Sequence, residues 1–136
     1  MTTATGPSVS ADVAEGVRAT LAAYCHALDD GRTDDLVALF TADAVSVLPG
    51  MDPVTGTDAL RTLYAAVVPT GPQRHLTLNT LVTGAGDEIS AISDLVFLKH
   101  GEAGWGVARV GRYDDVLRLE DGAWRLARRT LTFQPS

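Results

Sequence analysis

Hydrophobic residues recur with a helical period in the first part of the chain. Residues 12–30 predict one amphipathic helix, because Asp12 and Glu15 resemble a capping box at its start and Gly31 ends it. Five apolar residues form its predicted buried stripe: Val13, Val17, Leu21, Tyr24 and Leu28. Spacings of three and four positions are those of one helix face.

Two shorter helices and one strand are predicted before residue 74. Thr33 is placed to cap a short helix with the sequence DDLVALF, and Thr57 to cap a third helix that ends at PTGP, residues 69–72. Between these helices, residues 44–48 (AVSVL) predict a short strand and residues 51–56 predict a loop. The first half of the chain is therefore expected to be mainly helical.

The period of the pattern changes from helical to two at Arg74. Four segments alternate as strands do and are separated by glycine-containing turns: residues 74–83, 88–99, 105–119 and 123–133. Three helices followed by four antiparallel strands predict an α+β fold, with helices packed on one face of a curved sheet whose concave side can enclose a pocket. We expect residues 1–10 to be a flexible tail and residues 11–136 to form a single domain.

Composition limits the class of protein and its partners. The 136 residues carry a formal net charge of −6 and one cysteine, and the N-terminus lacks the basic and apolar regions of a secretory signal. These features predict a cytoplasmic protein that binds a small molecule. They argue against nucleic acid and membranes as partners, since no apolar run approaches the roughly 18 residues of a membrane span.

The stretch RHLTLNTLV, residues 74–82, places His75 and Asn79 on the same predicted strand face. Such a face is exposed at a sheet edge, or holds a core histidine satisfied by a hydrogen bond, or lines a pocket. Asp29 and Asp30 close the first predicted helix, where a carboxylate opposes the helix dipole, and one of them continues the buried stripe. That carboxylate is placed either to accept a hydrogen bond from an imidazole N–H, and so orient the ring, or simply to end the helix with a polar residue.

Other polar residues carry less specific signals. His26 lies off the apolar stripe, Cys25 is expected to be a structural thiol, and His100 is at the end of a strand. Arg128 and Arg129 are adjacent on a strand, so one of them must point inward. The sequence contains no zinc, calcium, dinucleotide or P-loop pattern, so we expect no metal and no cofactor.

Three segments together resemble the SnoaL-like family of the nuclear transport factor 2-like superfamily. They are YCHALDDGRTDDLVALFTADAVSVLPG (residues 24–50), RHLTLN (residues 74–79) and GRYDDVLRLEDGAWRLARR (residues 111–129). The resemblance extends over nearly the whole chain, and it implies a cone in which a curved sheet wraps around a deep, mostly apolar pocket. It also implies a homodimer, which we expect to associate through the outer face of strands 88–99 and 105–119. Because this fold supports many chemistries, the resemblance identifies the substrate only weakly.

The scytalone dehydratase-like branch of this family uses an aspartate from the first helix and a histidine from the strand after the third helix. The resemblance places Asp29 and His75 at those positions, and His100 at the position of a second pocket histidine. The pocket serine and asparagine of that dehydratase fall on Gly111 and Tyr113, so this part of its site is not kept.

The residues and the resemblance together predict a lyase or cyclase in which His75 is the general base and Asp29 orients it. The expected substrate-binding residues are Tyr24, Asn79, His100 and Tyr113. The predicted substrate is a polyketide-like or other secondary-metabolite intermediate that undergoes dehydration or cyclisation. The alternatives are an isomerase of the same superfamily and a non-catalytic protein that binds a small ligand.

Overall fold

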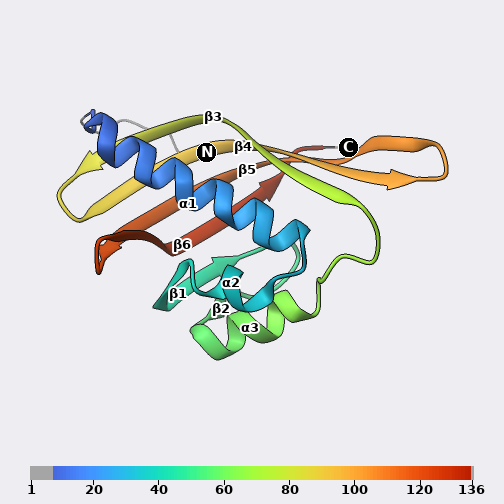
Figure 1. Cartoon of the computed structure of the whole chain (residues 1–136), viewed down its shortest axis with the longest axis horizontal. Helices are drawn as coiled ribbons and strands as arrows, with labels where there is room; N and C mark the ends of the chain where they lie inside the picture. Colours follow the sequence, from blue (N-terminus) through green and yellow to red (C-terminus); the bar gives the residue numbers. More distant parts are fainter. Residues whose placement is uncertain (1–7, 136) are drawn as a thin grey trace.

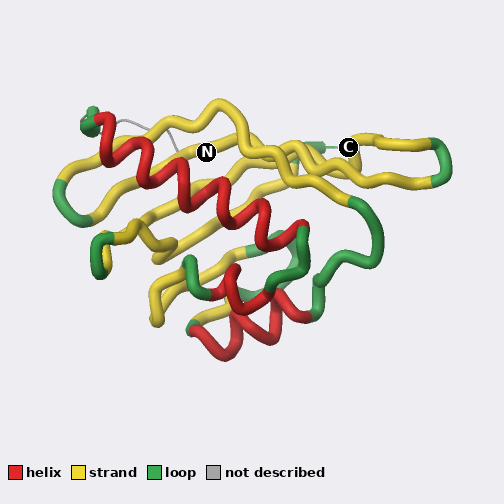
Figure 2. The backbone as a smooth tube through the Cα atoms, viewed as in Figure 1, coloured by secondary structure: helices red, strands yellow, loops and turns green. Residues whose placement is uncertain are grey.

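A computed structural model describes residues 8–135, in which three helices lie against one face of a curved, unclosed, six-stranded sheet (Figure 1, Figure 2). The helices are α1 (Ala11–Asp29), α2 (Thr33–Val37) and α3 (Thr57–Ala65). The strands are β1 (Phe40–Val47), β2 (Val54–Thr55), β3 (Gln73–Ala85), β4 (Glu88–Gly101), β5 (Gly104–Glu120) and β6 (Ala123–Phe133). This arrangement confirms the predicted α+β class. Residues 1–7 of the predicted tail lie outside the described residues, and Ser8 forms an antiparallel bridge with Thr83.

The start of α1 differs from the predicted capping box. The helix begins at Ala11, and Ser10 is its N-cap, with an extended backbone (φ −66°, ψ 159°). The Ser10 side chain accepts a hydrogen bond from the Val13 N–H at 3.3 Å, which satisfies one of the free donors of the first turn. The capping box predicted at Asp12 and Glu15 is therefore wrong, because the chain has already entered the helix there.

The two shorter helices also lack the predicted caps. Thr33 and Thr57 are the first helical residues of α2 and α3. The residues before them, Arg32 and Gly56, make no side-chain capping hydrogen bond. The second helix is shorter than predicted, since Phe40 already belongs to β1.

The sheet extends beyond the four predicted strands. Strands β3 to β6 form consecutive antiparallel hairpins, as predicted, with ends within two residues of the expected bounds. β6 then pairs in parallel with β1, and β1 pairs with β2, which gives the strand order β2-β1-β6-β5-β4-β3. The predicted strand at 44–48 therefore begins too late, and the predicted loop at 51–56 contains a strand. The partner β6 of β1 lies at the other end of the chain, and β2 has only two residues, so local alternation indicates neither pairing.

The core lies between α1 and the inner face of the sheet. A Cβ on Gly16 would lie 2.8 Å from Cδ1 of Trp124, so helix and strand approach closely there. Thr20 Oγ1 donates to the Trp124 carbonyl oxygen at 2.6 Å. Nine large buried residues show the extent of this core: Leu21, Tyr24, Leu36, Leu60, Tyr64, Leu95, Tyr113, Leu117 and Leu126. The β4–β5 hairpin projects beyond the helices (Figure 1), so the helices cover only part of the inner face.

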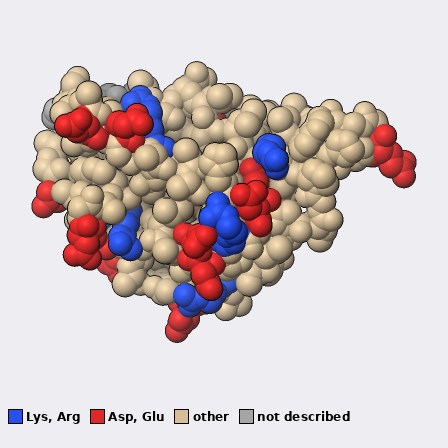
Figure 3. All heavy atoms as spheres, viewed as in Figure 1, with Lys and Arg blue, Asp and Glu red and all other residues tan. Residues whose placement is uncertain are grey.

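Charged side chains are unevenly spread over the surface. On the face seen in Figure 3 they gather over the helices, and the projecting hairpin shows few of them before the acidic side chain at its tip. Among residues 8–135, no helix is both long enough and apolar enough to cross a membrane.

Candidate active site

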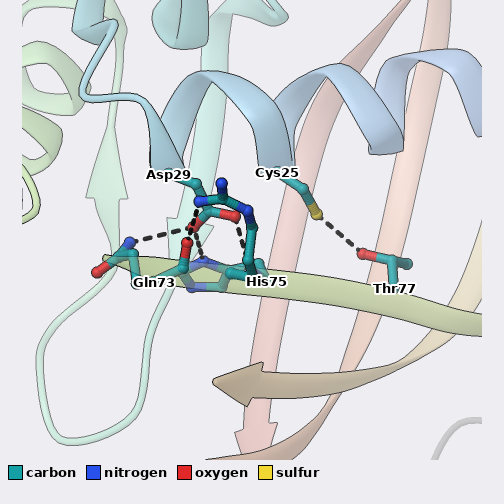
Figure 4. A network of polar contacts seen from close by, with 6 residues as sticks. Cys25, Asp29, Gln73, His75 and Thr77 are labelled. Carbon is teal, nitrogen blue, oxygen red and sulfur yellow. Dashed lines mark hydrogen bonds and ion pairs between the residues drawn. The ribbon is translucent and has the colours of Figure 1, made fainter. Parts of the chain in front are cut away.

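Asp29 and His75 come together at the C-terminal end of α1, above the edge strand β3 (Figure 4). Asp29 Oδ1 lies 2.6 Å from His75 Nδ1, and Oδ2 accepts a hydrogen bond from the His75 backbone N–H at 2.7 Å. Gln73 Nε2 donates a further hydrogen bond to Oδ1 at 3.1 Å. The expected contact between the two side chains is therefore present. These donors also compensate a carboxylate that stands at the negative end of the helix dipole.

The protonation of Asp29 determines which nitrogen of His75 carries a proton. Burial acts to raise the pKa of the Asp29 carboxyl, but hydrogen bonds from the His75 ring and backbone, with the charge of His75, lower this pKa below its ordinary value. The carboxylate is therefore ionised at neutral pH and has no proton to donate. His75 Nδ1 must be the donor of the shared hydrogen bond, and Nε2 is the free acceptor of the neutral ring.

The His75 ring is also fixed by an aromatic contact. It stacks on Phe97 of the neighbouring strand, with 4.3 Å between ring centroids and 27° between the planes. Phe97 is directly opposite His75 in the β3–β4 register. One edge of the imidazole is thus tied to Asp29 and one face lies on Phe97, which leaves a ring of defined orientation for proton transfer.

A cavity of about 480 Å³ lies between the helices and the inner face of the sheet, and His75 forms part of its wall. Its lining is mainly apolar, but Tyr24 and Tyr113, two of the predicted substrate-binding residues, both contribute to it. Tyr64 of α3 lines it as well. A concave apolar site with a few polar groups is the usual form of a small-molecule site. No group of three potential metal ligands (His, Cys, Asp or Glu) occurs in the described part of the chain.

Three tyrosines gather at the buried end of this cavity. The hydroxyl oxygens of Tyr24 and Tyr64 are 3.0 Å apart, and Ser46 Oγ lies 3.3 Å from the Tyr64 hydroxyl. Burial raises the pKa of Tyr24 and of Tyr113 well above the ordinary value. The phenols therefore stay protonated and are able to donate hydrogen bonds to an oxygen in the cavity. Tyr64 and its partner Ser46 were not among the predicted site residues, although Tyr64 lies on the buried face of α3.

Arg129 is the inward member of the Arg128–Arg129 pair. It is fully buried, with Nε 3.1 Å from Asp115 Oδ1. Its Cζ lies 3.4 Å from the ring centroid of Tyr113 and 4.1 Å from that of Tyr24. Burial raises the pKa of Asp115 to about 6, and the charge of Arg129 opposes that rise. Neither residue of this ion pair lines the cavity. Arg129 packs against the rings of Tyr24 and Tyr113 and helps to hold them in place.

The prediction that His75 and Asn79 share a pocket face fails for this cavity, which His75 lines and Asn79 does not. A bulge shifts the β3–β4 register at Asn79, which adopts a positive φ of 55°. Its side chain donates to Asp94 Oδ2 at 3.0 Å. Asp94 alternates along β4 with the buried Leu95, so it lies on the outer face of the sheet. Asn79 is therefore turned away from the cavity.

The prediction that His100 is a second pocket histidine is also wrong. His100 is exposed near the tip of the β4–β5 hairpin, where its ring meets that of Trp105 edge to face at 5.4 Å between centroids. It does not line the cavity, whereas its neighbour Lys99 does. The alternation of side chains along β4 places Lys99 on the inner face and His100 on the outer face.

A second hollow, of about 570 Å³, lies between α1 and β3. His75 lines both this groove and the cavity, whereas Asp29 and Asn79 line the groove and not the cavity. Cys25 lies at the groove with Sγ 3.1 Å from Thr77 Oγ1 (Figure 4). Burial raises the pKa of the Cys25 thiol, which fits the predicted structural role. His26 is exposed on the same groove.

Comparison with known proteins finds a family and a set of similar structures. The family profile described as "SnoaL-like domain" matches residues 10–130. The structure of a Mycobacterium tuberculosis protein of unknown function is similar, with 28% sequence identity and a TM-score of 0.86. That match covers 92% of this chain and 73% of the other. No curated protein matches the chain.

Two similar structures come from Novosphingobium aromaticivorans. One is a candidate aromatic ring hydroxylase with 25% identity and a TM-score of 0.81, and the match covers 95% of this chain and 94% of the other. The second is a candidate scytalone dehydratase with 21% identity and a TM-score of 0.81, matched over 91% of this chain and 85% of the other. The second match shows the fold alone. Since one fold carries proteins assigned to such different reactions, the chemistry must be argued from the site.

Proposed function

The chain belongs to the SnoaL-like family, and on this premise we propose that it is a cofactor-independent enzyme that moves a proton on a small organic substrate. The observation that carries the proposal is the Asp29–His75 pair, in which the carboxylate binds Nδ1 and His75 forms part of the cavity wall. The free Nε2 is then a general base in a mainly apolar site. The best supported reactions are elimination of water and cyclisation of a polyketide-like or other secondary-metabolite intermediate.

The proposed elimination begins when His75 Nε2 takes a proton from the carbon next to a carbonyl group. The electron pair of that C–H bond forms the new C=C bond, and the C–O bond at the next carbon breaks. The leaving oxygen takes the proton back from the imidazolium and departs as water. Asp29 stabilises the imidazolium between these two transfers. In a cyclisation, the same deprotonation makes an enolate carbon that attacks a second carbonyl of the molecule, whose oxygen receives the proton.

The buried phenols are the proposed stabilisers of negative charge on the substrate. Tyr24 and Tyr113 line the cavity with His75 and are protonated at neutral pH. A positioned donor of this kind is worth roughly 3 kcal/mol to a transition state in a site that excludes water. The expected role of both residues in substrate binding is kept in this proposal, and that of Asn79 and His100 is not.

Two alternatives use the same cavity. An isomerase would use His75 in the same way, but the ring would return the proton to a different carbon of the substrate. A non-catalytic ligand-binding protein would need the apolar cavity and not the Asp29–His75 pair. The dehydratase serine has no counterpart here, because a Cβ on Gly111 would lie 2.9 Å from the Thr132 carbonyl oxygen.

Deuterium exchange into 2-tetralone tests the base without knowledge of the natural substrate. This bicyclic ketone has acidic C–H groups, whose replacement by deuterium in D₂O is followed by proton NMR. We expect exchange above the buffer rate, and a loss of roughly 10²–10⁴-fold of that acceleration in His75→Ala. Asp29→Asn should lose less, because its imidazole remains. The control is His26→Ala, because His26 is exposed in the groove between α1 and β3 and does not line the cavity. Equal rates for a folded His75→Ala and the wild type, or no acceleration by either, would favour the ligand-binding alternative.

A further inference from the structure

Two cations stand at the solvent end of the cavity. Lys99 of β4 and Arg109 of β5 both line it, and both are exposed. At the opposite end, Tyr24, Leu95 and Tyr113 are at most 2% exposed. The cavity therefore runs from a buried tyrosine floor to a basic mouth.

Each of these cations rests on an aromatic ring. Lys99 Nζ lies 5.9 Å from the ring centroid of Phe97, and Arg109 Cζ lies 5.1 Å from that of Phe133. Such contacts hold a cation in place over the ring while its N–H groups stay available to an anion. Within residues 8–135, neither cation forms an ion pair with a carboxylate.

The charge of the mouth is opposite to that of the whole chain. The sequence has 17 acidic and 11 basic residues and a formal net charge of −6. The cavity lining nevertheless contains Lys99 and Arg109 and no aspartate or glutamate among the described residues. An acidic protein repels anions in general, so a local pair of unpaired cations is where an organic anion would be attracted.

Strand register relates the mouth to the proposed base. His75 is opposite Phe97 in the β3–β4 pairing, and Phe97 is opposite Arg109 in the β4–β5 pairing. These three residues form one row across three strands. Neighbouring strands are about 4.8 Å apart, so the backbones of His75 and Arg109 are separated by roughly 10 Å. That span matches a planar molecule of two fused rings with a charged group at one end.

We propose that the substrate is a planar organic anion, whose carboxylate or similar group is bound by Lys99 and Arg109 while its uncharged end meets His75. The proposal rests on the function proposed above, which it makes more specific by naming the substrate class. Phe97 lies between His75 and Arg109 in the same row and also lines the cavity, so the body of this molecule would have an apolar neighbour there.

Binding of two matched probes tests this proposal. 2-Naphthoate and 2-naphthamide have the same ring system and nearly the same shape, and only the first is charged at neutral pH. Isothermal titration of the full chain should show naphthoate binding about tenfold more tightly at low salt, from two charge contacts of modest strength. Arg109→Met and Lys99→Met should each weaken naphthoate binding about threefold and leave naphthamide binding unchanged. Arg109→Lys should restore most of the preference.

The exposed Arg128 provides the matched control, since Arg128→Met removes the same charge from outside the cavity. Equal loss of naphthoate affinity in Arg128→Met and Arg109→Met would overturn the proposal, as would equal affinity of the wild type for both probes or no binding of either at millimolar concentration. His75→Ala should retain the preference for naphthoate. If it does so while deuterium exchange shows no role for His75, the anion site stands and the proposed catalytic function fails.

Discussion

Asp29 holds His75 by two atoms, because one carboxylate oxygen lies 2.6 Å from the ring Nδ1 and the other accepts the backbone N–H at 2.7 Å. The first contact fixes the ring, and the second fixes the edge strand β3 to the end of α1. A single side chain thus couples the geometry of the proposed base to the stability of the fold. Substitutions at Asp29 should therefore be visible in unfolding measurements as well as in activity.

Asp29→Asn should destabilise the protein. Asparagine offers one acceptor oxygen in place of two, so its amide N–H₂ would face either the His75 backbone N–H or the ring N–H. The Asp29 side chain is only 5% exposed, and a donor left facing a donor in such a site costs roughly 1–3 kcal/mol. Urea unfolding should show this loss. Asp30→Asn, which removes the exposed neighbouring carboxylate, should change the free energy of unfolding by less than about 0.5 kcal/mol. Equal losses would contradict the role of Asp29.

The stability of the protein should fall in acid through the same residue. Burial opposes the effect, but the His75 hydrogen bonds hold the folded pKa of Asp29 below its ordinary value of 3.8. The unfolded chain then binds more protons than the folded chain once the pH falls below about 5. The contribution of Asp29 is complete above the ordinary pKa and is lost as the pH falls through the folded pKa. Between pH 6 and pH 3, urea unfolding should show a steeper fall in the free energy of unfolding for the wild type than for Asp29→Asn. Parallel curves for the two proteins would contradict a contribution of Asp29 to the acid sensitivity.

Gly111 should be intolerant of a side chain. A Cβ at this position would lie 2.9 Å from the Thr132 carbonyl oxygen and 3.0 Å from Leu131 Cδ1. Gly111→Ala should therefore cost roughly 1–3 kcal/mol, the usual range for overpacking. Gly106 on the same strand is the matched control, because a Cβ there meets no atom within 4 Å. The same thermal unfolding midpoint for Gly111→Ala and Gly106→Ala would contradict the expected steric conflict at position 111.

The long strands and the fold class were predictable because their signals are local. Alternation and glycine turns located β3 to β6, and the apolar stripe located α1. The parallel pairing of β1 with β6 was not predictable, since it joins segments that are far apart in the chain. The contact between Asp29 and His75 was not predictable from local patterns for the same reason, since the two residues are 46 positions apart. Only the resemblance linked them.

Asn79 shows why a correct strand assignment still misplaced a side chain. The alternation rule assumes an unbroken ladder, and one bulged residue turns the following positions to the other face. Asparagine is one of the few residues that tolerates the left-handed backbone region, so Asn79 itself was the only local hint of the bulge. Lys99 and Arg109 were missed for a different reason. Their proposed role in binding an anion depends on their position at the cavity, and the net charge of the chain gives no information about that position.

The outer face of the sheet leads to the last prediction, which concerns the oligomeric state. Three leucines of β3 remain 40–59% exposed: Leu76, Leu78 and Leu81. Leu78 is opposite Asp94, which lies on the outer face, and Val110 of β5 is also 42% exposed. An exposed apolar face of this kind commonly marks a protein interface.

We therefore expect light scattering to give twice the 14.3 kDa mass of one chain at micromolar concentration. Leu78→Lys should shift the protein towards the monomer, because a buried unpaired charge strongly disfavours association. Met51→Lys, at an equally exposed residue outside the sheet, should leave the mass unchanged. A wild-type mass of one chain would rule out the dimer. A dimer that persists in Leu78→Lys would show that the interface lies on another face and does not include the outer leucines of β3.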